Sequence, residues 1–213
     1  MGATPSGRRS GLARARGAAA SARRAAPALL LLGALLASGC GDSADRAPDL
    51  PGALYEPPRP APALRLSGAA GPYDLAAERG RVVLVFFGFT NCPDICPATL
   101  ENWAKVRALL GEDAARVRFL FVSVDPKRDT PEIAAGYAAR FDSTFVGVAG
   151  TEAEIADVAL AWGVTVGGGP EEIVHASQVF LVDAEGRLRW GYGRSVTTEQ
   201  IAGGVRSFLP RAG

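Results

Sequence analysis

Two cysteines and a single histidine carry the most distinctive chemistry of this chain. Cys92 and Cys96 are separated by three residues, and they follow an apolar run that is typical of a buried strand. His175 is the only histidine among 213 residues. Two thiolate sulfurs and one imidazole nitrogen suit Cu(I), and the high affinity of such ligands for copper also admits Cu(II). The residue types therefore suggest a copper site formed by Cys92, Cys96 and His175.

Structural zinc, a structural disulfide and a hydrogen-bonding histidine are alternatives to a copper site at these residues. Structural zinc usually has four protein ligands, and no third cysteine or second histidine lies near this pair. A disulfide between Cys92 and Cys96 that only staples the fold would close a short loop, so it would constrain the unfolded chain little. A lone histidine is commonly a hydrogen-bonding residue, and His175 becomes a ligand candidate only if the fold brings it near the cysteines.

Apolar stretches alternate with helical ones after residue 64, which indicates βαβ units and a parallel sheet. The strands are expected at residues 82–89, 117–124, 145–148, 178–183 and 188–192, and the helices at 97–110, 131–141, 152–162 and from 197 or 198 to about 209. The pattern predicts an α/β fold: a thioredoxin-like α/β/α sandwich with a central mixed sheet, an added N-terminal hairpin and loop insertions. Trp103, Phe86, Phe87 and Phe89 are expected in its core.

This arrangement predicts how the candidate ligands meet. Cys92 falls in the loop after a strand, and Cys96 falls in the first turn of the next helix, where free N–H groups and the helix dipole favour a thiolate. His175 precedes the strand at 178–183, which would run beside the strand at 82–89. Asp94 is interpreted as a loop or capping residue and not as a ligand.

The acidic residues of the segment from 125 to 130 are interpreted as structural. Asp125 stands in an Asp-Pro pair at a strand end, which commonly starts a turn, with positioning of the site or of a partner as a secondary role. Asp129 or Thr130 is expected to cap the helix at 131–141, because Pro131 is tolerated in a first turn.

The N-terminal part of the chain has the pattern of an export signal. Six arginines between residues 8 and 24 precede an apolar run of about 15 residues, which is shorter than the roughly 20 needed to span a bilayer. The sequence Leu36-Ala37-Ser38-Gly39-Cys40 looks like a lipobox with Cys40 as the lipidated residue, although Ala37 stands where leucine is preferred. An uncleaved or a conventionally cleaved signal without lipidation is the alternative. Either interpretation places the domain outside the cytoplasm.

Composition and proline content divide the chain into three parts. Residues 1–40 are interpreted as a lipoprotein-type signal peptide, residues 41–62 as a tether rich in proline and alanine, and residues 63–213 as the thioredoxin-like domain. The chain is 48% apolar, which is sufficient for a core, and its 23 basic and 22 acidic residues are balanced. The balance gives no reason to expect a nucleic-acid partner.

Three sequence blocks resemble the Sco/SenC family. The first is Phe86-Phe87-Gly88-Phe89-Thr90-Asn91-Cys92-Pro93-Asp94-Ile95-Cys96-Pro97, the second is Val122-Ser123-Val124-Asp125-Pro126-Lys127-Arg128-Asp129-Thr130-Pro131, and the third is His175 followed by the strand Phe180-Leu181-Val182-Asp183. The likeness extends from about residue 64 to 209. Family members often have serine or threonine directly after the histidine, whereas this chain has Ala176 and then Ser177.

The resemblance implies a specific function and location. It implies a copper metallochaperone that binds one copper ion through Cys92, Cys96 and His175 and delivers it to the dinuclear copper site of cytochrome c oxidase. Its partners would be the copper-binding oxidase subunit and thioredoxin-like reductants or other copper chaperones. Together with the signal, it implies a lipoprotein of the bacterial cell envelope, anchored to the membrane through Cys40 and facing the periplasm or extracytoplasmic space.

Two enzymatic alternatives use the same cysteines. A thiol-disulfide oxidoreductase could reduce the copper-ligand cysteines of the oxidase subunit, and Cys92 with Cys96 would be its redox-active pair and disulfide. A Cys-x-x-x-Cys spacing differs from the Cys-x-x-Cys of general thioredoxin-like enzymes, which favours metal handling. A peroxidase of the peroxiredoxin type is disfavoured, because no arginine or lysine lies within the loop to activate Cys92.

Overall fold

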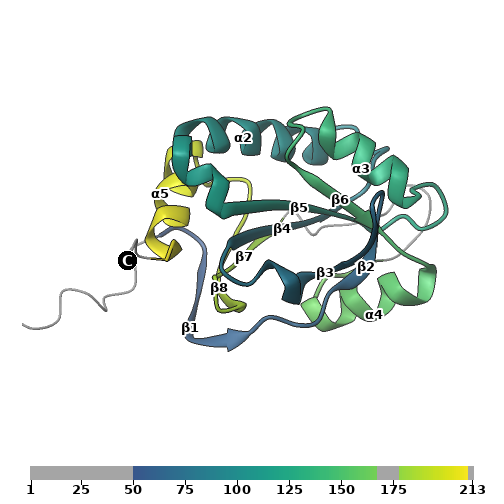
Figure 1. Ribbon diagram of the computed structural model, residues 1–213, viewed down its shortest axis with the longest axis horizontal. Helices are drawn as coiled ribbons and strands as arrows, with labels where there is room; N and C mark the ends of the chain where they lie inside the picture. Colours follow the sequence, from purple (N-terminus) through teal and green to yellow (C-terminus); the bar gives the residue numbers. More distant parts are fainter. Residues whose placement is uncertain (1–49, 167–177, 211–213) are drawn as a thin grey trace, which may run out of the picture. The chain divides into compact units, whose positions relative to one another are not determined.

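Strand β4 (Val82–Gly88) is the centre of the sheet, because all seven of its residues are buried. The computed structural model describes residues 50–166 and 178–210 (Figure 1). Within them, eight strands form one mixed sheet in the order β1-β8-β7-β4-β5-β6-β2-β3. The other strands are β1 (Ala53–Pro60), β2 (Arg65–Gly68), β3 (Gly71–Asp74), β5 (Val117–Ser123), β6 (Val146–Ala149), β7 (Val179–Val182) and β8 (Arg187–Tyr192).

Four α-helices and two short 3-10 helices accompany the sheet in the described ranges. They are α2 (Ile95–Leu110), α3 (Pro131–Ala139), α4 (Glu152–Trp162), α5 (Thr198–Phe208), η1 (Leu75–Glu78) and η2 (Gly111–Arg116). Helix α2 begins two residues before the predicted start, and Pro97 is accommodated in its first turn because the N–H that proline lacks would have no helical acceptor there. Helix α3 ends two residues before the predicted end.

The pairing of β4 with its two neighbours determines which strand ends lie side by side. Strand β4 runs parallel to β5, with Phe86 opposite Phe121, and antiparallel to β7, with Phe86 opposite Val179. The beginning of β7 therefore lies beside the end of β4. This is the edge of the sheet at which the connection from β4 to α2 begins.

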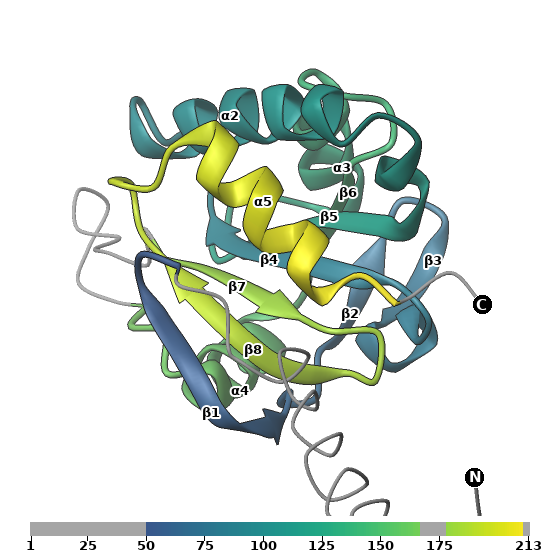
Figure 2. The ribbon, with the colours of Figure 1, turned by 90° about the vertical axis from the view of Figure 1, so that its left-hand side faces the viewer.

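The two faces of the sheet bury separate hydrophobic clusters. Helices α2, α3 and α5 cover one face, where Phe86, Trp103 and Trp190 are among the fully buried side chains. Helix α4 covers the other face, where Phe87 packs against Trp162 with ring centroids 5.5 Å apart. Figures 1 and 2 show these three layers, with α5 lying beside α2. The predicted thioredoxin-like α/β/α sandwich with a mixed sheet is confirmed.

The two edges of the sheet are formed by strands near the N-terminal end of the described chain, which are a hairpin at one edge and β1 at the other. Strands β2 and β3 form an antiparallel hairpin, and β2 also pairs with β6. Residues 53–60, which belong to the stretch interpreted as a tether, form edge strand β1 and pair with β8. Proline is tolerated on an edge because its missing N–H interrupts no interior ladder, and the pairing of β1 is irregular between Leu54 and Arg59.

No helix in the described ranges is long and apolar enough to cross a membrane.

Candidate functional site

The two cysteines flank the start of helix α2, as predicted. Strand β4 ends at Gly88, Cys92 lies in the connection that follows, and Cys96 is the second residue of the helix. Both thiols are free. The backbone N–H of Cys96 donates a hydrogen bond to the Cys92 sulfur at 3.4 Å. The Cys92 sulfur thus lies at the N-terminal end of α2, where N–H groups have no helical acceptors and stabilise negative charge.

The two thiols differ in exposure. Cys92 is partly exposed, whereas Cys96 is only 3% exposed and belongs to the core that lies under α2. Burial raises the pKa of the Cys96 thiol far above its ordinary value, and the hydrogen bond with Cys92 contributes to the rise. Burial at Cys96 therefore opposes the stabilisation of a thiolate that is expected at a helix N-terminus, because desolvation disfavours the charged form of the thiol.

Strand β4 gives Cys96 its space by ending in glycine. A methyl group at Gly88 would lie 2.8 Å from the Cys96 sulfur and 2.9 Å from a ring carbon of Phe121. Real Cβ atoms do not approach neighbours so closely, because the van der Waals repulsion is too large. The absence of a side chain at Gly88 is therefore a condition for the observed position of the Cys96 sulfur.

Asp94 and Arg194 form an ion pair that joins the start of α2 to the segment after β8. Asp94 stands at the N-cap position of α2, but its side chain makes no capping hydrogen bond. Its carboxylate instead lies 3.6 Å from the guanidinium of Arg194, which follows β8. Both side chains are well exposed, so the pair contributes little to stability. No sequence signal points to Arg194, because it reaches the cysteine loop only through the pairing of β8 with β7.

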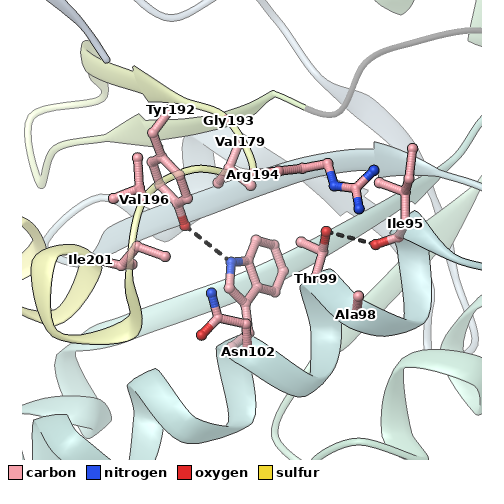
Figure 3. Close-up of a pocket in the computed structure, with 11 residues that line it drawn as sticks. Ile95, Ala98, Thr99, Asn102, Val179, Tyr192, Gly193, Arg194, Val196 and Ile201 are labelled. Atoms are coloured by element: carbon pink, nitrogen blue, oxygen red, sulfur yellow. Dashed lines mark hydrogen bonds between the residues drawn. The ribbon is translucent and has the colours of Figure 1, made fainter. Parts of the chain in front are cut away.

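A cavity of about 210 Å³ lies between α2, α5, the start of β7 and the end of β8 (Figure 3). Two of its lining residues are joined by a hydrogen bond of 3.2 Å from the Trp103 indole N–H to the Tyr192 hydroxyl. Ile95 and Arg194 also line it. Burial raises the pKa of Tyr192 far above its ordinary value, so its hydroxyl stays protonated.

The acidic residues before α3 have structural roles, as expected, but Asp129 is not the cap of the helix. The N-cap of α3 is Thr130, whose hydroxyl accepts a hydrogen bond from the Ile133 N–H at 3.3 Å. Asp129 does not cap the helix. Its buried carboxylate accepts hydrogen bonds from Thr90, in the cysteine loop, and from Ser123, at the end of β5. Asp125 is also buried and pairs with Arg128, in agreement with a structural role.

Two of the predicted site residues lie outside the described residues. These are His175, the predicted third ligand, and Cys40, the predicted lipidation site. Within residues 50–166 and 178–210, no group of three or more histidine, cysteine or acidic side chains is placed to hold a metal ion. The structure thus brings Cys92 and Cys96 together and leaves the third ligand as a prediction.

A thioredoxin-like fold with one free thiol in the connection after its central strand and a second in the first turn of the next helix defines a class of proteins that exchange thiols and disulfides or bind metals. Within that class, the SCO1/SenC family pattern matches residues 66–210. The chain belongs to the SCO1/SenC family.

Relatives with similar sequences are found in mitochondria and bacteria. The human mitochondrial protein SCO2 homolog is 35% identical over 139 residues, which are 62% of this chain and 52% of that protein. The SCO2-like protein RP587 of Rickettsia prowazekii is 33% identical over 148 residues, which are 62% of this chain and 72% of that protein. The chain spans about half the length of the human relative that it matches.

Solved structures of Sco proteins share the fold. Copper-bound ScoI of Bradyrhizobium japonicum has a TM-score of 0.64 and 31% identity, over 70% of this chain and 99% of that chain. Apo Sco1 of Thermus thermophilus has a TM-score of 0.65 and 34% identity, over 74% and 95%. BsSco, a Sco-family cytochrome c oxidase assembly protein with a disulfide switch, has a TM-score of 0.60 and 25% identity, over 71% and 94%.

Proposed function

We propose that this protein is a copper metallochaperone that binds one copper ion through Cys92, Cys96 and His175. The observation that carries the proposal is the pair of free thiols at the start of α2, in a member of a family whose copper-bound representative has the same fold. Two thiolates provide the soft ligands that Cu(I) prefers, and an imidazole completes a three-coordinate set. Copper is the cargo of this protein, to be passed to the dinuclear copper site of cytochrome c oxidase.

The register of the sheet supports His175 as the third ligand. Val179 begins β7 and lies opposite Phe86, near the end of β4. His175 precedes Val179 by four residues, and four residues span at most about 14 Å. A segment of four residues before Val179 could therefore reach from the start of β7 to the edge of the sheet at which the two cysteines lie.

The different exposure of the two sulfurs supports exchange of the metal. Cys92 is partly exposed and Cys96 is buried, so an incoming ligand would reach copper from the Cys92 side. Ligand-by-ligand replacement needs such an open side. Binding would release the thiol protons, because the thiolate is the form that coordinates metals.

The same cysteines can couple delivery to redox state. Loss of two electrons and two protons to a disulfide or other two-electron acceptor would join the two sulfurs and remove both thiolate ligands. Copper titration of the reduced and the oxidised protein tests this directly. We expect one copper per chain in the reduced form and none in the disulfide form; equally tight binding by both would overturn the proposal.

A thiol-disulfide oxidoreductase is the second candidate, favoured by the exposed Cys92 and buried Cys96. The exposed thiol could attack a disulfide of the oxidase subunit, and the buried thiol could then resolve the mixed disulfide. This function needs no histidine. The His175→Ala variant would keep full reductase turnover on a protein disulfide if this candidate is right, whereas the chaperone proposal predicts impaired copper binding by the same variant.

We also propose that the protein is a lipoprotein of the bacterial cell envelope, anchored through Cys40. The arginine-rich start, the apolar run and the lipobox-like sequence support this location. In an envelope location the domain faces an oxidising compartment, where a cysteine pair needs a reductant to remain able to bind copper.

A further inference from the structure

Asp129 is an acidic side chain that is almost completely withdrawn from solvent, with 2% of its surface exposed. Its carboxylate accepts three hydrogen bonds. The Thr90 backbone N–H donates to Oδ2 at 2.9 Å, and the Thr90 hydroxyl donates to Oδ1 at 2.6 Å. The Ser123 hydroxyl donates to Oδ2 at 2.5 Å. One carboxylate thus links the connection after β4, the end of β5 and the start of α3.

These three hydrogen bonds offset most of the free-energy cost of removing the Asp129 carboxylate from water. None of the ion pairs between residues of the described ranges includes Asp129, so no cation in those ranges neutralises it at contact distance. Burying a carboxylate is costly unless it is hydrogen-bonded. The N-terminal end of α3, directly after Asp129, adds a favourable dipole. Removal of the carboxylate would leave the Thr90 donors without their partner.

Thr90 is the residue through which Asp129 acts on the site. It stands two residues before Cys92 and donates two hydrogen bonds to the same carboxylate, so its backbone and its side chain are fixed together. The next fixed point along the loop is the hydrogen bond from the Cys92 N–H to the Phe89 carbonyl, at 3.3 Å. The segment that leads to Cys92 is therefore hydrogen-bonded, through Thr90, to a residue 37 positions beyond Cys92 in the chain.

We propose that Asp129 is a positioning residue for the cysteine loop, which holds Cys92 so that its sulfur lies against the N-terminus of α2. The inference deepens the proposed function and rests on it for the role of Cys92 as a ligand. A residue that only stabilises the fold would, when changed, lower the overall stability and leave the loop of the folded protein as it was. A positioning residue would change the loop in a protein that is still folded.

The test compares Asp129→Asn and Thr90→Val with the control Asp142→Asn in the full chain. Asp142 accepts the same two kinds of hydrogen bond, from the Thr144 N–H at 2.8 Å and from the Thr144 hydroxyl at 2.6 Å, but on the connection from α3 to β6. Hydrogen exchange of the backbone amides at positions 90 and 92 is measured without copper. We expect exchange there to be about 10- to 100-fold faster in both loop variants, which is the size expected for losing a hydrogen bond to a buried charged group.

A copper readout accompanies the exchange measurement. In the reduced protein loaded with Cu(II), Asp129→Asn and Thr90→Val are expected to shift the thiolate-to-copper absorption, whereas Asp142→Asn leaves it unchanged. Unchanged exchange at Thr90 and Cys92 in folded Asp129→Asn would overturn the inference, and if that variant fails to fold, Thr90→Val decides alone. A parent protein that binds no copper would refute the proposed function, while the exchange result would still decide the role of Asp129.

Discussion

At the scale of single residues, the site is asymmetric. Cys92 is partly exposed and accepts a hydrogen bond from the start of α2, whereas Cys96 is 3% exposed and its pKa is raised by burial. The nucleophile of a thiol is its thiolate, so the exposure of Cys92 favours its reaction and the raised pKa of the Cys96 thiol disfavours reaction there. The two sulfurs should therefore differ in reactivity although only three residues separate them.

Alkylation of the reduced protein should follow this order. We expect a limiting amount of iodoacetamide at neutral pH to modify Cys92 and to leave Cys96 almost unmodified. Peptide mass spectrometry measures both residues in one sample, so each is the control for the other. Equal modification of both cysteines at partial labelling would contradict the asymmetry.

At the scale of the elements, the junction of β4 and α2 builds the site. The strand supplies Gly88, whose missing side chain leaves room for the Cys96 sulfur, and the helix supplies the Cys96 N–H that donates a hydrogen bond to the Cys92 sulfur. Helix α5 is held to the same layer by a comparable close approach, since a methyl group at Gly204 would lie 2.6 Å from a ring carbon of Trp190.

The Gly88→Ala substitution should disturb the site from the strand side. The new methyl group must displace the Cys96 sulfur or the Phe121 ring, and overpacking of this kind costs about 1–3 kcal/mol of the free energy of unfolding. Denaturant unfolding measures this cost, and Cu(II) absorption measures the change at the sulfur. An alanine variant with unchanged stability and unchanged absorption would show that the junction has more room than the structure gives it.

Two neighbouring glycines of α5 should respond in opposite ways to alanine. A methyl group at Gly203 would have no atom within 4 Å, so Gly203→Ala should stabilise the helix by about 0.5–1 kcal/mol through its better helix propensity. Gly204→Ala meets the Trp190 ring and should destabilise the fold by about 1–3 kcal/mol. Thermal unfolding of the two variants compares them directly, and the same sign of change for both would be the contrary result.

Most of these elements, but only part of the site, could be predicted from the sequence. Strand β4 and helices α2 and α4 are predictable because their apolar periodicity and end signals are local. The cysteine pair is predictable because residue type and spacing alone define it. The role of Asp129 is not, because its hydrogen bonds reach Thr90 over 39 positions of sequence and its place before α3 suggests a cap. The burial of Cys96 escapes prediction for the same reason, since it depends on tertiary packing against β4 and not on the helix end.

At the scale of the whole molecule, the chain combines a proposed export and anchoring segment with a single sandwich of the SCO1/SenC family. The family consists of cytochrome c oxidase assembly proteins, and the sandwich carries the two cysteines at one edge of its sheet. Strand β1 joins the proline-rich segment to the sheet through β8. The proposed anchor would keep the proposed copper site near a membrane-bound acceptor and raise its effective concentration there.

The proposed anchor predicts where the full-length protein is found. We expect the wild-type protein in the membrane fraction of cells and Cys40→Ser in a soluble or uncleaved form, because the serine cannot receive the lipid. Fractionation followed by mass spectrometry of the N-terminal peptide distinguishes these forms. Retention of a cleaved Cys40→Ser protein in the membrane fraction would argue against the lipid anchor.

Copper titration of the reduced protein beside His175→Ala tests whether Cys92, Cys96 and His175 bind copper together. Stoichiometry and the thiolate-to-Cu(II) absorption are measured together under anaerobic conditions. If Cys92, Cys96 and His175 form the site, the wild-type protein binds one copper ion per chain, and the alanine variant binds it more weakly with a shifted absorption. No binding by the wild-type protein, or binding that is indifferent to His175, would contradict the account and favour a thiol-disulfide enzyme.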